Sequence, residues 1–177
     1  MTGENSQSFA GNRCFFPLTG VLLKAPRKGD VMIVSVPADI NLLLKLKENY
    51  AWPRPDRCPG CNHFKVWGHG FAYCCFDFST DPIPIKRYRC PNCGCVIRLR
   101  PEGYFNRFQA SVDTIRKCID FIVTTGKAIK GICRQRQYHW FAALKKRAVA
   151  LFGLGADLKQ AFASLIAEGV IPVSRAI

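Results

Sequence analysis

The chain has 177 residues, enough for one ordinary domain or two small ones, and 49% of them are apolar, which excludes a wholly disordered protein. Its 26 Lys and Arg exceed its 12 Asp and Glu and leave a formal net charge of +14, a balance that favours a polyanionic partner, nucleic acid first. No run approaches the roughly 20 apolar residues of a membrane-spanning helix, and the chain start lacks the basic and apolar regions of a signal peptide. We therefore expect a cytoplasmic, nucleoid-associated protein without a membrane partner.

Residues 1–52 are the part of the chain with the fewest recognisable features. Short apolar runs between positions 13 and 36 are separated by Gly and Pro, a pattern typical of strands and turns. Asp39 is placed to cap a helix, which should end before the stiff stretch Trp52-Pro53-Arg54-Pro55. We expect a short N-terminal α/β segment that ends at this stretch, and the sequence assigns no role to it.

Residues 53–105 alternate apolar and polar positions between Gly and Pro, the pattern of a small antiparallel sheet. Two similar cysteine pairs, CPGC at 58–61 and CPNC at 90–93, are separated by 28 residues, enough for strands that leave one pair and return to the other. Four soft thiolates suit tetrahedral zinc, with iron as the competing metal. We therefore predict one structural zinc ion, bound by Cys58, Cys61, Cys90 and Cys93.

Other potential ligands lie close to these pairs in the sequence, namely His63, His69, Cys74, Cys75 and Cys95. Cys74 and Cys75 are neighbours, so on a strand only one of them could face a metal. His63 and Cys95 follow the two pairs closely, and either could replace a ligand. We expect core packing for Cys74 and Cys75, and because four cysteines already complete a tetrahedral set, no position remains for a catalytic water.

The stretches CPGCNHFKVWGHG and IKRYRCPNCGCVIRLRPEGY resemble the zinc ribbons of bacterial insertion-sequence proteins. In those families, the small InsA-like DNA-binding proteins and the N-terminal parts of several transposases, the ribbon commonly precedes a helix-turn-helix. The resemblance covers roughly residues 52–105. It implies DNA binding in a mobile genetic element, with a transposase or recombinase as protein partner. The insert that holds Cys74 and Cys75 and the first 50 residues depart from the pattern.

Residues 106–177 change to a helical period of apolar positions, and glycines divide them into about three helices. The 12 basic and 5 acidic residues from position 101 onward make this part of the chain strongly basic. We interpret it as a DNA-binding region that is compatible with a helix-turn-helix. The fold class is therefore α+β, a small antiparallel zinc ribbon followed by a basic helical region.

The candidate contacts to nucleic acid are mostly basic side chains in both parts of the chain. They are Lys86, Arg87, Arg89, Arg98 and Arg100 in the ribbon, and Arg134, Arg136, Gln137, Lys145, Lys146 and Arg147 in the helical region. Alternation along a strand puts Arg87 and Arg89 on one face and Lys86 on the other. The run Lys145-Lys146-Arg147 is expected on the solvent face of an amphipathic helix.

A group of aromatic residues in the ribbon could stack on bases. A ribbon this small also needs apolar side chains for its core, and we favour the core for all of them. The group is Phe64, Trp67, Phe71, Tyr73, Phe76 and Phe78.

The acidic residues are scattered, and the sequence contains no phosphate-binding glycine loop or recognisable nucleophile pair, so we predict no enzymatic activity. The favoured function is a DNA-binding accessory or regulatory protein of a mobile element that contacts duplex DNA together with a transposase or recombinase. The alternative is a protein-interaction subunit of a larger nucleoprotein complex, including one that contains RNA. The sequence does not distinguish DNA from RNA.

Overall fold

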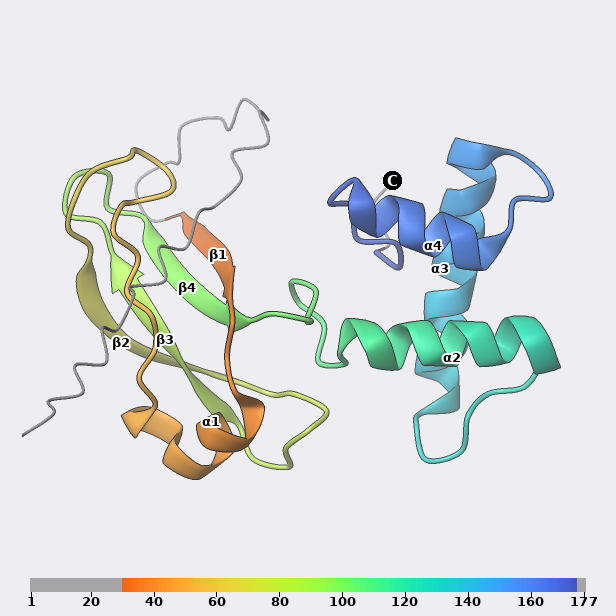
Figure 1. Cartoon of the computed structure of the whole chain (residues 1–177), viewed down its shortest axis with the longest axis horizontal. Helices are drawn as coiled ribbons and strands as arrows, with labels where there is room; N and C mark the ends of the chain where they lie inside the picture. Colours follow the sequence, from red (N-terminus) through yellow and green to blue (C-terminus); the bar gives the residue numbers. More distant parts are fainter. Residues whose placement is uncertain (1–29, 175–177) are drawn as a thin grey trace, which may run out of the picture.

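The computed structural model describes residues 30–174, which form a sheet lobe and a helical lobe (Figure 1). The sheet lobe contains β1 (Val31–Val36), α1 (Ile40–Leu46), the short 3-10 helix η1 (Lys47–Asn49), β2 (Trp67–Cys74), β3 (Ile83–Arg89) and β4 (Val96–Pro101). The helical lobe contains α2 (Val112–Thr125), α3 (Arg134–Phe152) and α4 (Leu158–Ala167). The predicted α+β class and the three C-terminal helices are confirmed. The strands predicted before position 30 lie outside the described residues.

The four strands form one mixed sheet in the order β1-β4-β3-β2. β2 pairs with β3 and β3 with β4 in antiparallel fashion, as the alternating pattern predicted. β1 joins the other side of β4 in parallel, with Val31 opposite Val96 and Val36 opposite Pro101. Residues on both sides of position 52 therefore share one sheet, through a long-range pairing that no local pattern in the sequence indicates.

One face of this sheet, which we call the covered face, is occupied by apolar side chains. Val36, Tyr88, Ile97 and Leu99 are buried on it and belong to the core of the sheet lobe. The same core includes Leu43 of α1, a helix whose N-terminal cap is the predicted aspartate, which accepts a hydrogen bond from the backbone of the first turn. The N-terminal part of the chain thus supplies both a strand and a helix to the core around the cysteine-bearing strands.

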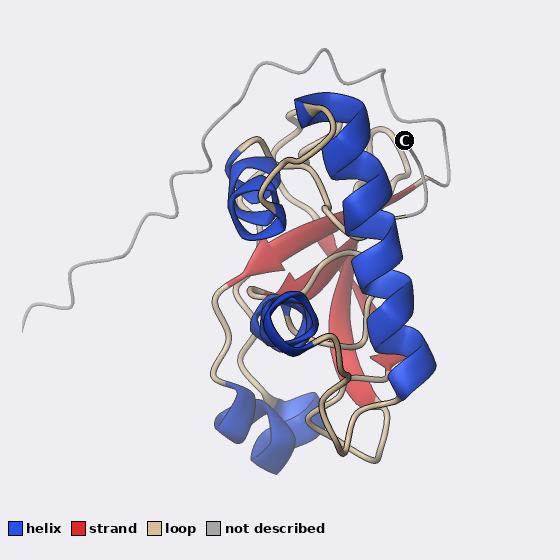
Figure 2. Ribbon diagram, turned by 90° about the vertical axis from the view of Figure 1, so that its right-hand side faces the viewer, coloured by secondary structure: helices blue, strands red, loops and turns tan. Residues whose placement is uncertain are grey.

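The helical lobe has its own core, formed where the three helices meet. In Figure 1, α3 crosses α2 at a steep angle, and Figure 2 shows the helices in front of the sheet when the molecule is seen from the helical end. α2 ends at Thr125 and is capped by Gly126, whose positive φ of 70° is the left-handed conformation that glycine adopts without strain. Ile119, Trp140, Leu144 and Phe162 are among the buried core residues.

Two groups of hydrogen bonds connect the lobes at the segment between β4 and α2. The Arg100 guanidinium at the end of β4 donates to the Phe108 carbonyl. Asp77, in the β2–β3 connection, donates its amide to the Gln109 carbonyl (3.0 Å) and accepts from the Ser111 amide (3.2 Å). Ser111 in turn caps α2. The sheet and the first helix of the helical lobe are therefore linked through specific polar contacts.

Gln137, which the sequence analysis placed at the nucleic-acid interface, is fully buried at the start of α3. Its side-chain oxygen accepts from the Ile129 amide, and its side-chain nitrogen donates to the carbonyls of Ile129 and Ile132, all at 2.9 Å. Its burial corrects the prediction, because a side chain that already satisfies three backbone groups inside the protein cannot also contact a ligand. Gln137 instead holds the connection between α2 and α3.

Replacing Gln137 with Ala should lower the free energy of unfolding of the helical lobe by about 2 to 4 kcal/mol, because buried backbone groups lose their partners. Urea unfolding followed by circular dichroism measures the change. Gln135→Ala is the matched control, since Gln135 is exposed on the same helix, and it should change stability by less than about 0.5 kcal/mol. Equal effects of the two substitutions would contradict this structural role.

Candidate metal centre and nucleic-acid interface

The cysteines at 58–61 and 90–93 meet at one end of the sheet, one pair in the segment that leads to β2 and the other between β3 and β4. The sulfur atoms of Cys58 and Cys93 are 3.6 Å apart, as are those of Cys61 and Cys90, and all four lie within 4.8 Å of one another. Sulfurs at about 2.3 Å from a tetrahedral zinc ion would be about 3.8 Å apart. The four cysteines therefore lie close together, as predicted, and can hold a metal ion.

The two cysteine turns have the same backbone geometry. In each turn the amide of the first cysteine, Cys58 or Cys90, donates to the carbonyl of the residue five positions later. The carbonyl of that same cysteine accepts from the amide four positions later, which belongs to Asn62 in one turn and to Gly94 in the other. Both of these residues have positive φ, a conformation that Asn and Gly tolerate best. The sequence similarity of the two pairs thus reflects one repeated turn.

Burial and hydrogen bonds from the backbone or from Asn92 have opposite effects on the pKa of the cysteine thiols. Burial raises the pKa of the Cys58 thiol, although the Gly60 amide, 3.4 Å away, acts in the opposite direction. Burial also opposes ionisation of Cys61, but hydrogen bonds from the Asn92 side chain and the His63 backbone, with smaller effects of neighbouring thiols, lower its pKa to about 6. A metal ion requires deprotonated sulfur, and the hydrogen bonds to Cys61 favour that form of its side chain.

Cys95 is an alternative ligand that the structure brings to this cluster. It is fully buried, its sulfur lies 3.4 Å from that of Cys58, and burial raises its pKa to about 11. Cys74 is the last residue of β2, so it is remote from the cysteine turns at the other end of that strand. Cys75 is exposed rather than packed in the core, which corrects the expectation for this residue, and His63 is exposed as well.

We expect the purified protein to contain one zinc ion per chain, and Cys90→Ser to lose the metal and unfold the sheet lobe, because the four sulfurs connect its strands. Elemental analysis and circular dichroism measure the two effects. Cys118→Ser is the control, since Cys118 is buried in the helical lobe, and it should keep the metal. Two metal ions per chain would contradict a single tetrahedral site.

Cys95→Ser tests the ligand set directly. This variant should retain one metal ion, because Cys95 is not one of the four converging cysteines. Cys93→Ser should lose the ion, because Cys93 is one of them. The opposite pair of results in the same elemental analysis would show that Cys95 is the fourth ligand.

The sheet face opposite the covered face carries Arg87, Arg89, Arg98 and Arg100, and we call this part of it the arginine face. Arg87 and Arg98 are direct partners on adjacent strands, an arrangement in which like charges destabilise a sheet. Within residues 30–174 the Nε atoms of both are buried without a hydrogen-bond partner, and the salt bridge found there joins a lysine and an aspartate elsewhere, Lys47 with Asp81. The arginine face therefore concentrates positive charge that the described part of the chain leaves uncompensated.

Two of the five basic residues predicted to contact nucleic acid from the ribbon do not lie exposed on the arginine face. Lys86 lies on the covered-face side, opposite Phe71, with its ammonium 4.4 Å from the centre of that ring. Arg100 is buried, donates to the Phe108 carbonyl and lies over the Phe76 ring. Burial lowers the pKa of its guanidinium, and a neighbouring arginine charge acts in the same direction. The assignment of Arg100 to nucleic-acid contact is thus corrected to a structural link between the lobes.

Arg147 is a further residue whose predicted environment is wrong. It is only 7% exposed, and its guanidinium donates to the Ser174 hydroxyl (2.8 Å), so it packs against the chain that follows α4 instead of facing solvent. The other basic residues predicted on α3 are exposed as expected, and they are Arg134, Arg136, Lys145 and Lys146. Arg134 and Lys145 are 11 residues apart, about three helical turns, and therefore lie nearly in line on one side of α3.

The aromatic residues also divide differently from the prediction that all six form the core. Phe76 is buried, and Phe71 and Phe78 are partly buried against the core. The other three, Phe64, Trp67 and Tyr73, are 59%, 61% and 64% exposed. The physical reason is that residues of α1, β1 and β4 and the buried Trp52 fill the core, so the edge strand β2 does not need to contribute all its rings.

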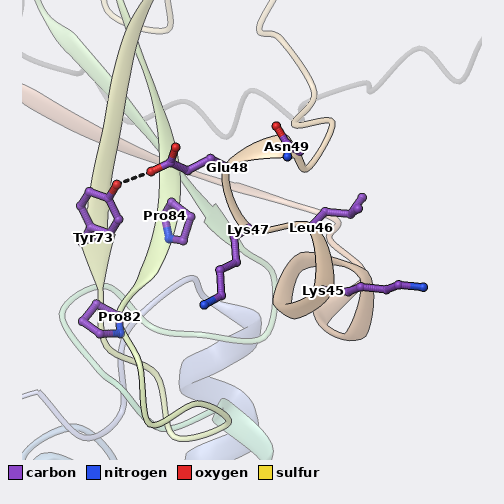
Figure 3. A pocket seen from close by; sticks show the side chains of 8 residues that line it. All are labelled: Lys45, Leu46, Lys47, Glu48, Asn49, Tyr73, Pro82 and Pro84. Atoms are coloured by element: carbon purple, nitrogen blue, oxygen red, sulfur yellow. Dashed lines mark hydrogen bonds between the residues drawn. The ribbon is translucent and has the colours of Figure 1, made fainter.

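An open pocket of about 440 Å³ lies between the α1–η1 segment and the β2–β3 strands (Figure 3). Its lining residues are Lys45, Leu46, Lys47, Glu48, Asn49, Tyr73, Pro82 and Pro84. The Tyr73 hydroxyl donates to the Glu48 carboxylate, and this hydrogen bond, together with the negative charge, raises the pKa of Tyr73. The single carboxylate of the lining is thus already engaged, and the lining contains no thiol or imidazole for a nucleophilic or acid–base mechanism.

No protein-family model, curated protein or solved structure matches this chain. Among residues 30–174, none of the helices has the length and apolar character needed to cross a bilayer. The cysteine cluster and the arginine face are therefore the features from which function is inferred.

Proposed function

We propose that the protein is a nucleic-acid-binding accessory or regulatory protein of a mobile genetic element, acting on DNA together with a transposase or recombinase. The observation that carries the proposal is the arginine face beside the cysteine cluster. Arg87 and Arg98 face each other across β3 and β4 without a compensating acid among the described residues, and Arg89 directly precedes Cys90. A polyanion bound to such a surface would offset the repulsion between the arginine charges.

In this proposal the cysteine cluster binds zinc and makes β2, β3 and β4 a zinc ribbon. All four positions around the metal would be protein sulfurs, so the ion would have a structural role and no site for an activated water. The metal would hold the two turns together, and with them the ends of β2, β3 and β4. The arginines would then keep a fixed spacing, which a flexible basic loop would not provide.

Phosphate is the group that suits the arginine face best. A guanidinium offers paired N–H donors to phosphate oxygens and remains charged at any physiological pH. Contacts of this kind position a protein on nucleic acid without reading sequence. The proposal therefore assigns backbone binding to Arg87, Arg89 and Arg98, and leaves sequence recognition to other residues.

The helical lobe would add a second basic contact in the manner of a helix-turn-helix. The exposed side of α3 presents Arg134, Lys145 and Lys146, and a basic exposed helix can approach the backbone or groove of a duplex. α2 and α4 would support it from the buried side, where Trp140 and Leu144 pack.

The alternative function, a protein-interaction subunit of a larger nucleoprotein complex, is favoured by a different observation. Leu151 and Phe152 at the end of α3 are exposed, and Leu154 in the following loop is 92% exposed. Exposed apolar side chains that cluster in sequence often mark a surface that binds another protein. These residues are separate from the arginine face, so both functions can be tested in one set of variants.

The double substitution Arg87→Ala and Arg98→Ala should weaken binding to duplex DNA. The slope of the logarithm of the binding constant against the logarithm of salt concentration should become shallower by about 0.9 for each phosphate that the variant no longer neutralises. Removal of two opposed like charges should leave the metal content unchanged and the stability of the free protein equal or higher. Fluorescence anisotropy at several salt concentrations measures the binding.

The matched control is Lys45→Ala with Lys47→Ala, which removes the same charge from the α1–η1 segment, where both lysines are exposed. Equal effects of the two double variants would show that only net charge matters. If Arg87→Ala with Arg98→Ala, and separately Lys145→Ala with Lys146→Ala, leave binding unchanged, the interaction-subunit function replaces this proposal.

A further inference from the structure

Trp67, the first residue of β2, is the one exposed tryptophan of the chain. Trp52 and Trp140 are buried in the cores of the two lobes, whereas Trp67 is 61% exposed. A tryptophan left in water exposes a large apolar surface, and such surfaces commonly mark a binding site. The position of this ring on the sheet therefore indicates what it binds.

The strand register places Trp67 on the arginine face. Its direct partner on β3 is Arg89, and residues that are direct partners on adjacent strands project to the same face. Arg98 on the next strand, β4, is the direct partner of Arg87. With about 4.8 Å between neighbouring strands and about 3.3 Å per residue along each strand, the backbone positions of Trp67 and Arg98, two strands and two residues apart, are separated by roughly 12 Å.

We propose that the arginine face binds single-stranded nucleic acid, with an unpaired base stacked on Trp67 and the adjoining phosphates on Arg87, Arg89 and Arg98. This inference rests on the proposed nucleic-acid-binding function and specifies the form of the ligand. It assigns the exposed ring and the uncompensated arginines to one ligand. A span of roughly 12 Å corresponds to about three to four stacked nucleotides.

The chemistry of the ring favours a single strand over a duplex. In a duplex the faces of the bases are covered by their neighbours, and phosphates alone are enough to occupy the arginines. An unpaired base offers its face to an aromatic ring, and aromatic side chains next to basic residues are the usual surface for single strands. Sheet faces that carry exposed rings bind single-stranded RNA in the same way.

A second exposed ring lies close to Trp67 in the sequence. Phe64 is 59% exposed, and the guanidinium of Arg57 lies 3.8 Å from the centre of its ring. Arg57 directly precedes the first cysteine turn, as Arg89 directly precedes the second. Both cysteine turns are thus entered from an arginine that is paired with an aromatic residue, Phe64 in one case and Trp67 in the other.

The test uses the full-length, metal-loaded protein with a labelled single DNA strand, the RNA strand of the same sequence, and the matching DNA duplex. We expect a single strand to bind more tightly than the duplex and to quench the fluorescence of Trp67. Trp67→Ala should weaken single-strand binding by about 5- to 150-fold, the range expected for loss of one stacked base, and change duplex binding much less. Trp67→Phe should retain most of the affinity while abolishing the quenching.

Tyr73→Ala is the matched control, because Tyr73 is an equally exposed ring on the same strand but on the covered-face side, where it pairs with Pro84. It should leave single-strand binding unchanged. Metal content of each variant verifies that the sheet lobe is intact. The DNA and RNA arms identify which of the two strands is preferred.

Two results would overturn the inference in distinguishable ways. If duplex and single strands bind equally and Trp67→Ala resembles Tyr73→Ala, while Arg87→Ala with Arg98→Ala still weakens binding, the single-strand inference fails and the proposed function stands. If none of the three nucleic acids binds, both fail together.

Discussion

The convergence of four thiols at one end of the sheet is the contact that brings the separate segments of the sheet lobe together. Cys58 and Cys61 precede β2, and Cys90 and Cys93 connect β3 to β4, so the cluster ties together segments about 30 residues apart in the chain. The two turns share the same backbone hydrogen bonds. Because Arg89 immediately precedes Cys90, an ion that fixes these turns also fixes the end of the strand that presents the arginines.

Near the cysteine turns the two faces of the sheet have opposite effects on stability. The covered face buries Tyr88, Ile97 and Leu99 and supplies hydrophobic free energy to the lobe. The arginine face brings Arg87 and Arg98 together, which opposes folding. A sheet this small tolerates such a face only if other interactions offset it. The apolar residues of β1 and α1 do so, and a metal ion held by the cysteine cluster would add to their effect. Near the cysteine turns the alternation of side chains along the strands therefore separates stability from binding, whereas at the other end of β3 Ile83 and Ile85, on the side of the arginines, are also buried in the core.

The errors of the sequence analysis arise from burial, which depends on parts of the chain distant in sequence. Arg and Gln are residue types that often contact nucleic acid. The side chains of Arg100, Gln137 and Arg147, however, donate hydrogen bonds to backbone carbonyls or a hydroxyl group within the protein. Trp67 is a large apolar residue of the kind expected in the core, but it is exposed. In each case the deciding neighbour comes from another segment, such as the Phe108 carbonyl for Arg100, and a local pattern contains no information about it.

The sequence by itself determined the features set by local spacing: the cysteine turns, the alternation on β3 and β4, the cap at Asp39 and the three C-terminal helices. These depend on hydrogen bonds and periodicities within a few residues. Only the tertiary structure decided that β1 pairs with β4, that Leu43 and Trp52 fill the core, and that Trp67 remains exposed beside the arginines. The reason is physical: which apolar side chain is buried depends on competition among all segments for the same core volume.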